Sequence, residues 1–334
     1  MIQKTLLITG GTGYIGSHAV VAFEQAGYKT VIIDNLSNSS RKSLDGIQKI
    51  LWYTPDFYEC DICDQIGLKN IFEKYSFDGV IHFAGLKAVG ESCEEVVLYH
   101  SNNVWGSITL FWVMQDFWVH KIVFSSSATV YSPDNTSPLR EDMPLATTNP
   151  YGTTKLIIEK LLEDYTKHAN WRVVNLRYFN PIGAHSSWYI GEVPNGIPNN
   201  LLPYVLDVAS GKREQVRVFG DDYNTPDGTW VRDYIDVCDL VDAHLLAYRH
   251  LDDAKLWVYN IGTGTGTSVL EMIKVASNVT GKEIPYEVSA RRSGDIASVH
   301  CDPSLAMREL WFSAKTSTQE SISNGWKFIL NSQS

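Results

Sequence analysis

The sequence predicts an α/β fold, a doubly wound parallel sheet with a smaller C-terminal α/β lobe. Two observations carry this prediction: short apolar runs recur without polar alternation, and stretches with helical periodicity separate them. Strands that are apolar on both faces are typical of parallel sheets covered by helices on each side. With 334 residues, of which 44% are apolar, the chain is long enough for about two domains.

The first half of the chain supplies most of the expected sheet. Strands are expected at residues 5–9, 30–34, 57–62, 79–83 and 121–125, and helices at 17–26, 65–75 and 95–117. Right-handed crossovers between parallel strands then give a doubly wound sheet of the dinucleotide-binding (Rossmann) type.

The second half continues this pattern, and then the amino-acid composition changes. A helix is expected at 153–168 and a strand at 171–178, whereas residues 183–200 are rich in Gly, Pro, Asn and Ser. Further elements are expected at 201–210 (helix), 216–219 (strand), 234–251 (helix) and 257–261 (strand), and residues 268–330 form the rest of the lobe. We therefore assign residues 1–180, with a helix and strand from 233–262, to a dinucleotide-binding domain, and residues 181–232 and 263–334 to a substrate-binding lobe.

The net charge of −10 and the pI near 5.4 argue against nucleic acids or anionic membranes as partners. No apolar stretch is long enough to span a bilayer, and the first expected strand begins too early to leave room for a signal peptide. Five scattered cysteines favour a reducing, cytoplasmic location. Cys60 and Cys63 form a C-x-x-C pair, but no second pair and no histidine pair accompanies it, so we expect free thiols and no metal site.

A glycine-rich turn follows the first expected strand. Gly10, Gly13 and Gly16 recur at three-residue spacing and open a helix, and Asp34 ends the second strand. In this context glycines let the backbone approach a pyrophosphate at a helix N-terminus. The Asp34 carboxylate can accept hydrogen bonds from the adenosine ribose and would repel a 2′-phosphate, so the sequence favours NAD over NADP.

The ends of the later strands supply further candidates for cofactor binding. Asp61 and Ile62 end the third strand, where a carboxylate can meet the adenine amino group. Phe83 and Ala84 end the fourth, where a small residue lets the backbone come close, and Lys87 lies within reach of a phosphate or ribose. The residues next to the glycines and to Asp34 complete this set: Tyr14, Ile15 and Asn35.

Tyr151 and Lys155 form the most informative pair in the chain. A lysine four residues after a tyrosine lies on the same helical face, and its charge favours the phenolate of a side chain that ordinarily ionises near ~10. Ser127 follows the apolar run of 121–125 and adds a hydroxyl beside this pair. The three side chains predict a proton-handling site in an enzyme that moves hydride between an alcohol and a nicotinamide.

Several segments of the chain resemble one family of enzymes. Residues 9–18, 82–92, 124–131 and 177–185, with 196–201 and 231–234, resemble the UDP-glucose/UDP-galactose 4-epimerases of the extended short-chain dehydrogenase/reductase family. The resemblance implies tightly held NAD, reversible inversion at C4 of a UDP-sugar through a 4-keto intermediate, and a homodimer joined by a helix bundle. It implies that Tyr151 takes the proton of the 4-hydroxyl, that Ser127 holds the 4-oxygen, and that Lys155 binds the nicotinamide ribose.

The resemblance also implies the remaining site residues. Asn102 and Phe179 would line the cofactor site. The UDP-sugar would contact Ser127, Asn180, Asn200, Leu201, Phe219, Arg232, Arg292, Asp295 and Val299. The two arginines suit the pyrophosphate, because a guanidinium group binds phosphate oxygens through paired donors. Val299 stands where a large tyrosine would exclude N-acetylated sugars, so UDP-N-acetylglucosamine is a further possible substrate.

Some positions depart from the family pattern, and other functions stay open. Ser132 replaces an expected glycine near Ser127, and Asp236 replaces an expected histidine. Four tryptophans are bulkier than the residues expected there: Trp105, Trp112, Trp118 and Trp188. The alternatives are a UDP-pentose or UDP-uronate 4-epimerase, or a catalytically silent NAD-binding protein. A sugar-nucleotide 4,6-dehydratase is disfavoured, because Ala128 and Val130 stand where that reaction needs acidic residues.

Overall fold

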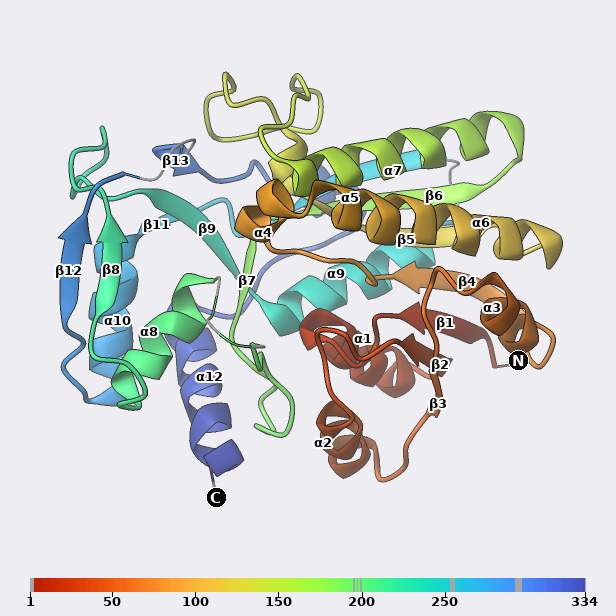
Figure 1. The fold of residues 1–334 in the computed structure, drawn as a ribbon, viewed down its shortest axis with the longest axis horizontal. Coiled ribbons are helices and arrows are strands. Elements are labelled where there is room, and N and C mark those ends of the chain that lie inside the picture. Colours follow the sequence, from red (N-terminus) through yellow and green to blue (C-terminus); the bar gives the residue numbers. More distant parts are fainter. Residues whose placement is uncertain are drawn as a thin grey trace.

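A parallel sheet forms the centre of the molecule (Figure 1). The computed structural model describes residues 3–194, 196, 198, 200–252, 256–291 and 296–333, and seven strands of this part lie in the order β10-β6-β5-β4-β1-β2-β3. Every neighbouring pair is parallel, which confirms the predicted fold class. The bounds are β1 Thr5–Thr9, β2 Lys29–Asp34, β3 Asp56–Glu59, β4 Phe77–His82, β5 Lys121–Ser127, β6 Arg172–Tyr178 and β10 Leu256–Ile261. The order reverses between β1 and β4, and ligands of open α/β sheets bind at such a switch point.

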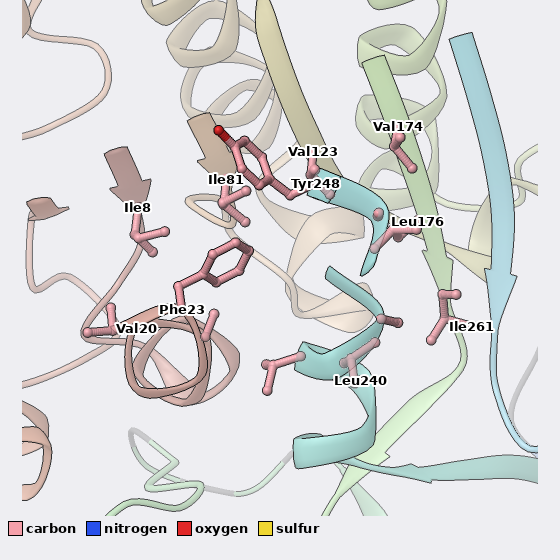
Figure 2. Packing of buried hydrophobic residues seen from close by; sticks show 14 of the residues in the cluster. Ile8, Val20, Phe23, Ile81, Val123, Val174, Leu176, Leu240, Tyr248 and Ile261 are labelled. Carbon is pink, nitrogen blue, oxygen red and sulfur yellow. The ribbon is translucent and has the colours of Figure 1, made fainter. Parts of the chain in front are cut away.

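Helices cover both faces of the sheet, with a separate hydrophobic core under each set. Along β5, Val123 faces one core while Ile122 and Phe124 face the other, as the two-residue period of a strand requires. Figure 2 shows the first core, where Phe23 and Leu240 pack toward the sheet. The helices over this core are α1 Tyr14–Gln25, α2 Lys42–Leu51 and α9 Val237–His250; those over the second are α3 Gln65–Phe72, α6 Gly106–Asp116 and α7 Pro150–His168.

A smaller lobe lies at one end of the central sheet (Figure 1). Its strands form a sheet of order β11-β9-β13, with β7 also paired to β9, and a separate pair of β8 and β12. Its helices pack around a third core that includes Leu202, Met272 and Ile322. The bounds are β7 Asn180–Ile182, α8 Leu201–Ala209, β8 Val216–Phe219, β9 Val231–Asp236, β11 Gly266–Ser268, α10 Val269–Thr280, β12 Tyr286–Ser289, β13 Ser298–Val299 and α12 Thr318–Gln333. The short helix α11 Ser304–Glu309 packs instead against the first core of the central sheet, through Ala306.

The helix expected at residues 95–117 is present at residues 96–116, but it is not a regular α-helix throughout. A short helix, α4 Val89–Glu94, is followed by α5 Val96–Tyr99, and a π-helical segment, His100–Trp105, separates α5 from α6. Side-chain hydroxyls bond to main-chain carbonyls here: Ser107 Oγ donates to Asn103 O at 2.6 Å, and Thr109 Oγ1 donates to Trp105 O at 3.0 Å. Such bonds compete with the regular helix pattern, and π-helical turns often lie at functional sites.

The helix expected at residues 234–251 begins later, at Val237. Residues 234–236 instead complete β9, which pairs with β7 and β11, and Asp236 caps α9 by accepting a hydrogen bond from Cys238 N at 2.8 Å. The strand depends on partners distant in sequence, which a local pattern cannot reveal. The departure at Asp236 therefore has a structural role as a helix cap.

None of the described helices combines the length and apolar composition that crossing a bilayer requires. Within the same residues, no three His, Cys, Asp or Glu side chains are grouped so that they could hold a metal ion. All five cysteines are free thiols.

Candidate active site

Five of the residues predicted for the site follow strands of the central sheet at one edge. Gly10 follows β1, Asp34 ends β2, Phe83 follows β4, Ser127 ends β5, and Phe179 follows β6. Because the strands are parallel, their carboxyl ends all meet at this edge, beside the switch point.

The glycine turn brings backbone atoms unusually close together. Gly10 has φ +68°, and a Cβ atom added to it would lie 2.8 Å from Ala84 N. A Cβ atom on Gly16 would lie 2.1 Å from Gly10 O, and Gly13 is the N-cap residue of α1. Ile15 is partly buried in the first turn of the same helix. The turn thus leaves the N-terminus of α1 open to an anionic group, as the pyrophosphate of a dinucleotide requires.

Acidic side chains shape the next two strand ends. Asp34 accepts hydrogen bonds from Thr12 N at 3.1 Å and Leu36 N at 2.9 Å. Asp61 accepts one from Asn35 Nδ2 at 2.7 Å, and the buried Ile62 lies next to it. Although burial opposes ionisation, hydrogen bonds from the Cys63 backbone and Asn35 hold the pKa of Asp61 below its usual value. Both carboxylates therefore stand at the edge where a ribose and an adenine amino group would need acceptors.

The structure brings Ser127, Tyr151 and Lys155 together. Tyr151 and Lys155 lie on the first turns of α7, and Ser127 lies close enough to the Tyr151 phenol to lower its pKa. Lys155 Nζ donates to Ser125 O at 2.6 Å and lies 5.8 Å from the centre of the Tyr151 ring. Thr129 Oγ1 donates to Ser127 Oγ at 3.0 Å, which fixes the serine at the end of β5.

The ionisation of the pair differs from the expectation. Burial raises the pKa of Tyr151 to about 12, although the hydrogen bond with Ser127 acts in the opposite direction. Burial lowers the pKa of Lys155 to about 8, against the opposing effect of the Glu159 carboxylate. In this structure the phenol is therefore protonated at neutral pH, because desolvation outweighs the effect of Ser127.

The predicted residue Asn102 lies beside a more deeply buried asparagine, Asn103, which the sequence analysis missed. Asn103 Oδ1 accepts from Leu86 N at 2.8 Å and from Asn102 Nδ2 at 2.8 Å, and its Nδ2 donates to Leu86 O at 3.0 Å and Thr154 Oγ1 at 3.1 Å. Asn103 thus ties the loop after β4 to α7. The two asparagines are adjacent in sequence, so no spacing signal shows which one faces inward.

A second missed residue, Glu192, bridges the cofactor side and the lobe. Glu192 Oε1 accepts from Lys87 Nζ at 3.1 Å and from Asn200 Nδ2 at 2.9 Å. Tyr14 reaches the lobe as well, since its Oη donates to Gly183 O at 2.8 Å. Residue 192 belongs to no motif, so only its contacts identify it.

The remaining predicted residues lie in or beside the lobe. Arg232 of β9 donates to Val231 O and Ile296 O, both at 2.8 Å, and pairs in register with Val299. Val299 packs against the small core that contains Phe179. The other positions are Asn180, which donates to Asp233 O at 3.0 Å, Leu201 at the start of α8, and Phe219 at the end of β8. Arg292 and Asp295 lie outside the described residues.

Fold and site together define a nicotinamide-dependent α/β enzyme: a dinucleotide-type turn at a switch point, with a Ser–Tyr–Lys set at the same edge. Residues 6–262 match the NAD dependent epimerase/dehydratase family, and the chain belongs to it.

Within this family, the chain is similar to UDP-glucose 4-epimerases. It is 51% identical to the UDP-glucose 4-epimerase of Bacillus subtilis over 97% of this chain and 96% of that protein. It is 44% identical to the enzyme of Stenotrophomonas maltophila, solved with NAD and formylated UDP-arabinopyranose, with a TM-score of 0.96 over 99% of both chains. It is 43% identical to the Bifidobacterium longum enzyme in complex with NAD+ and UDP, with a TM-score of 0.95 over 99% of both chains.

Proposed function

We propose that the protein is an NAD-dependent UDP-glucose 4-epimerase that reversibly inverts C4 of the hexose through a 4-keto sugar. The observation that carries this proposal is the set of Ser127, Tyr151 and Lys155 at the switch-point edge, next to the glycine turn. An inversion without net oxidation needs one site that removes and returns the same proton and hydride, and this edge offers both a proton-handling phenol and a place for a nicotinamide.

The residues at the sheet edge fit NAD. Gly10, Gly13 and Gly16 would hold the pyrophosphate at the N-terminus of α1, Asp34 the adenosine ribose, and Asp61 the adenine amino group. When bound, NAD supplies a nicotinamide that takes the C4 hydride and returns it to the opposite face of the sugar. The further residues proposed around it are Tyr14, Ile15, Asn35, Ile62, Phe83, Ala84, Lys87, Asn102 and Phe179.

The protein side chains would handle the proton. Tyr151 would take the proton of the 4-hydroxyl and give it back to the 4-oxygen, and Ser127 would hold that oxygen by a hydrogen bond. Lys155 would place a positive charge beside the phenol and bind the nicotinamide ribose. A positive charge is needed here, because burial raises the pKa of Tyr151 to about 12 in spite of Ser127.

The lobe would bind the UDP part of the substrate. Arg232 and Arg292 would hold the pyrophosphate, and Asp295 the uridine ribose. Asn180 and Asn200 would contact phosphate or sugar, and Leu201 and Phe219 the uracil. The small side chain of Val299 would leave room for an N-acetyl group, so we propose UDP-N-acetylglucosamine as a second substrate. Steady-state assays test this, and activity below about a thousandth of that on UDP-glucose would reject it.

The decisive experiment compares the parent with Tyr151→Phe. We expect the variant to lose about 100-fold or more of the turnover of UDP-galactose, because general acid–base catalysis contributes on that scale. Its NAD content should stay near that of the parent, measured as nucleotide released on denaturation. A variant as active as the parent would refute the mechanism, and NADP or no nucleotide in the parent would refute the cofactor assignment.

We further propose a homodimer in which α5, α6 and α7 pair with a second copy. Val97, Trp105 and Trp112 support it, because these apolar side chains are 79%, 51% and 45% exposed on one helical layer. Val97→Glu is expected to halve the mass measured by light scattering; a monomeric parent at micromolar concentration would contradict the proposal. We also propose a cytoplasmic location, which five free thiols favour, and the two-domain division at residues 180, 232 and 262.

A further inference from the structure

A buried ion pair lies between α7 and the sheet, behind the candidate catalytic residues. Arg177 of β6 donates from Nη2 to Glu159 Oε2 at 2.7 Å and from Nε to Glu159 Oε1 at 3.0 Å. The two side chains are only 4% and 5% exposed. Taking two charges out of water costs about as much as their attraction returns, so such a pair adds little net stability. The presence of the buried pair is therefore better explained by the residues that it holds in place.

The pair belongs to a network that reaches both sides of Ser127. Ser126 Oγ donates to Glu159 Oε1, and Arg177 Nη1 donates to Tyr131 Oη at 3.1 Å. Ser126 directly precedes Ser127, and Tyr131 ends the short 3₁₀ turn that follows it. Because Glu159 lies on α7, the network ties the end of β5 to the helix that also carries the candidate tyrosine.

Glu159 also lies one helical turn after Lys155, and both side chains are 5% exposed. The other titratable groups around Lys155 are Tyr151 on the same helix and His82 at the end of β4, and Tyr178 on β6 interacts in turn with Tyr151. Burial keeps all three uncharged near pH 7, since it raises the pKa values of both tyrosines and lowers the pKa of His82 to about 3. Glu159 is thus the carboxylate whose charge acts on Lys155.

We propose that Glu159 is a positioning residue for the epimerase chemistry, an inference that rests on the function proposed above. One of its oxygens holds Ser126, and through that residue the strand end that carries Ser127. Its charge keeps Lys155 in the ammonium form beside the phenol. Arg177 holds the carboxylate in place through two hydrogen bonds.

The test is the pH profile of kcat with UDP-galactose, measured from about pH 6 to about pH 10 for the parent and Glu159→Gln. We expect the alkaline limb of the variant to move down by about one pH unit, because loss of the carboxylate lowers the pKa of Lys155. KM should stay within about twofold, since Glu159 would not touch substrate. Glu163→Gln is the matched control: it lies one turn further along α7, pairs with Lys160 and Lys167 at the surface, and should leave the profile unchanged.

Glu159→Gln leaves the buried Arg177 guanidinium without its counter-charge, which can prevent folding. Further variants keep the test decisive in that case. The double variant Glu159→Gln/Arg177→Gln removes both charges and should still shift the limb downward. Glu159→Asp keeps the charge and should restore the parent profile. Ser126→Ala keeps every charge and should lower kcat about fivefold at an unchanged profile, because only the position of Ser127 changes.

Two results would overturn the inference: coincident profiles for an active parent and the Gln variants, or an unchanged kcat in Ser126→Ala. Failure of the proposed function is distinguishable, because then the parent itself would not turn over UDP-galactose.

Discussion

Four tryptophans occupy backbone conformations that ordinarily select glycine. Trp52, Trp118, Trp188 and Trp311 have φ values of 67°, 59°, 63° and 57°. Trp52 is the C-cap residue of α2, while Trp118 and Trp311 each follow the C-cap residue of a helix. At this position a left-handed residue lets the chain satisfy the last helix carbonyls, as when Val119 N donates to the carbonyl of Met114 at 2.9 Å. Glycine adopts the conformation without the steric cost of a Cβ atom.

Replacing Trp311 with glycine is expected to raise the free energy of unfolding by about 1 kcal/mol, since an L-residue in this conformation is strained by about 1–2 kcal/mol. The indole is 86% exposed, so little burial is lost. Urea unfolding of the parent, Trp311→Gly and Trp311→Ala measures the effect. Alanine keeps the Cβ atom and the strain, so an equal gain in both variants would show that the indole, not the backbone, is the cause.

The same backbone preference predicts glycine at these four positions in the protein as its natural host makes it. Among the described residues, four of the six non-glycine residues with positive φ are tryptophan, and from this we infer a shared cause in translation, namely a codon that the host reads as glycine. Peptide mass spectrometry of the chain isolated from its host checks this expectation. Peptides that contain tryptophan at the four positions would contradict it.

At the scale of the element, the start of α7 sets the distance between Tyr151 and Ser127. Asn149 Oδ1 caps the helix by accepting a hydrogen bond from Gly152 N at 2.8 Å. Gly152 lets the helix approach the turn after β5, because a Cβ atom there would lie 2.7 Å from Thr129 O. A displaced helix start would therefore move the phenol away from the serine.

Asn149→Ala is expected to lower the free energy of unfolding by about 1 kcal/mol, the usual cost of a lost N-cap. We expect kcat to fall about tenfold with little change in KM, because the displaced group acts on the reacting atoms. Ser268→Ala is the control: Ser268 Oγ caps α10 in the lobe by accepting from Glu271 N at 3.1 Å. It should cost stability without lowering kcat, and equal kcat values in the two variants would contradict the role given to the start of α7.

The elements that sequence patterns predicted well are those with a local signal. Continuous apolar runs located the strands of the central sheet, and the spacing of Gly10, Gly13 and Gly16 located the turn after β1. The π-helical segment before α6 and the strand β9 were missed, because side-chain hydroxyls and distant strand partners decide them. The desolvation that raises the pKa of Tyr151 was missed for a similar reason, since it depends on the packed fold.

At the scale of the whole molecule, contacts between the two ends of the candidate site escaped prediction. Glu192 joins Lys87 and Asn200, which are separated by more than a hundred residues, and no local pattern marks it. The substrate roles of Arg292 and Asp295 stay predictions, because both lie outside the described residues. The sequence thus predicted which side chains meet at the sheet edge, but not the polar groups that hold them there.

Three buried histidines make the stability of the whole molecule depend on pH. Burial lowers the pKa of His18 and His82 from 6.5 to about 3 and that of His244 to about 4. Main-chain acceptors oppose the effect at His18 and His244, where the ring Nδ1 atoms lie 2.7 Å from Tyr14 O and 2.9 Å from Leu240 O. All three side chains therefore stay uncharged in the folded protein at the pH values where the same histidines of the unfolded chain begin to bind protons.

Between about pH 6.5 and pH 4 the unfolded chain binds more protons at these sites, so the free energy of unfolding should fall as the pH falls. Each fully titrating histidine contributes at most about 1.4 kcal/mol per pH unit. Burial raises the pKa values of Asp236, Asp242 and Glu141, which offsets part of the loss. Urea unfolding at about pH 7 and about pH 5 measures the slope. His244→Gln should reduce it and the exposed control His168→Gln should not, whereas stability that stays flat or rises on acidification would show that these rings are charged or accessible in the folded state.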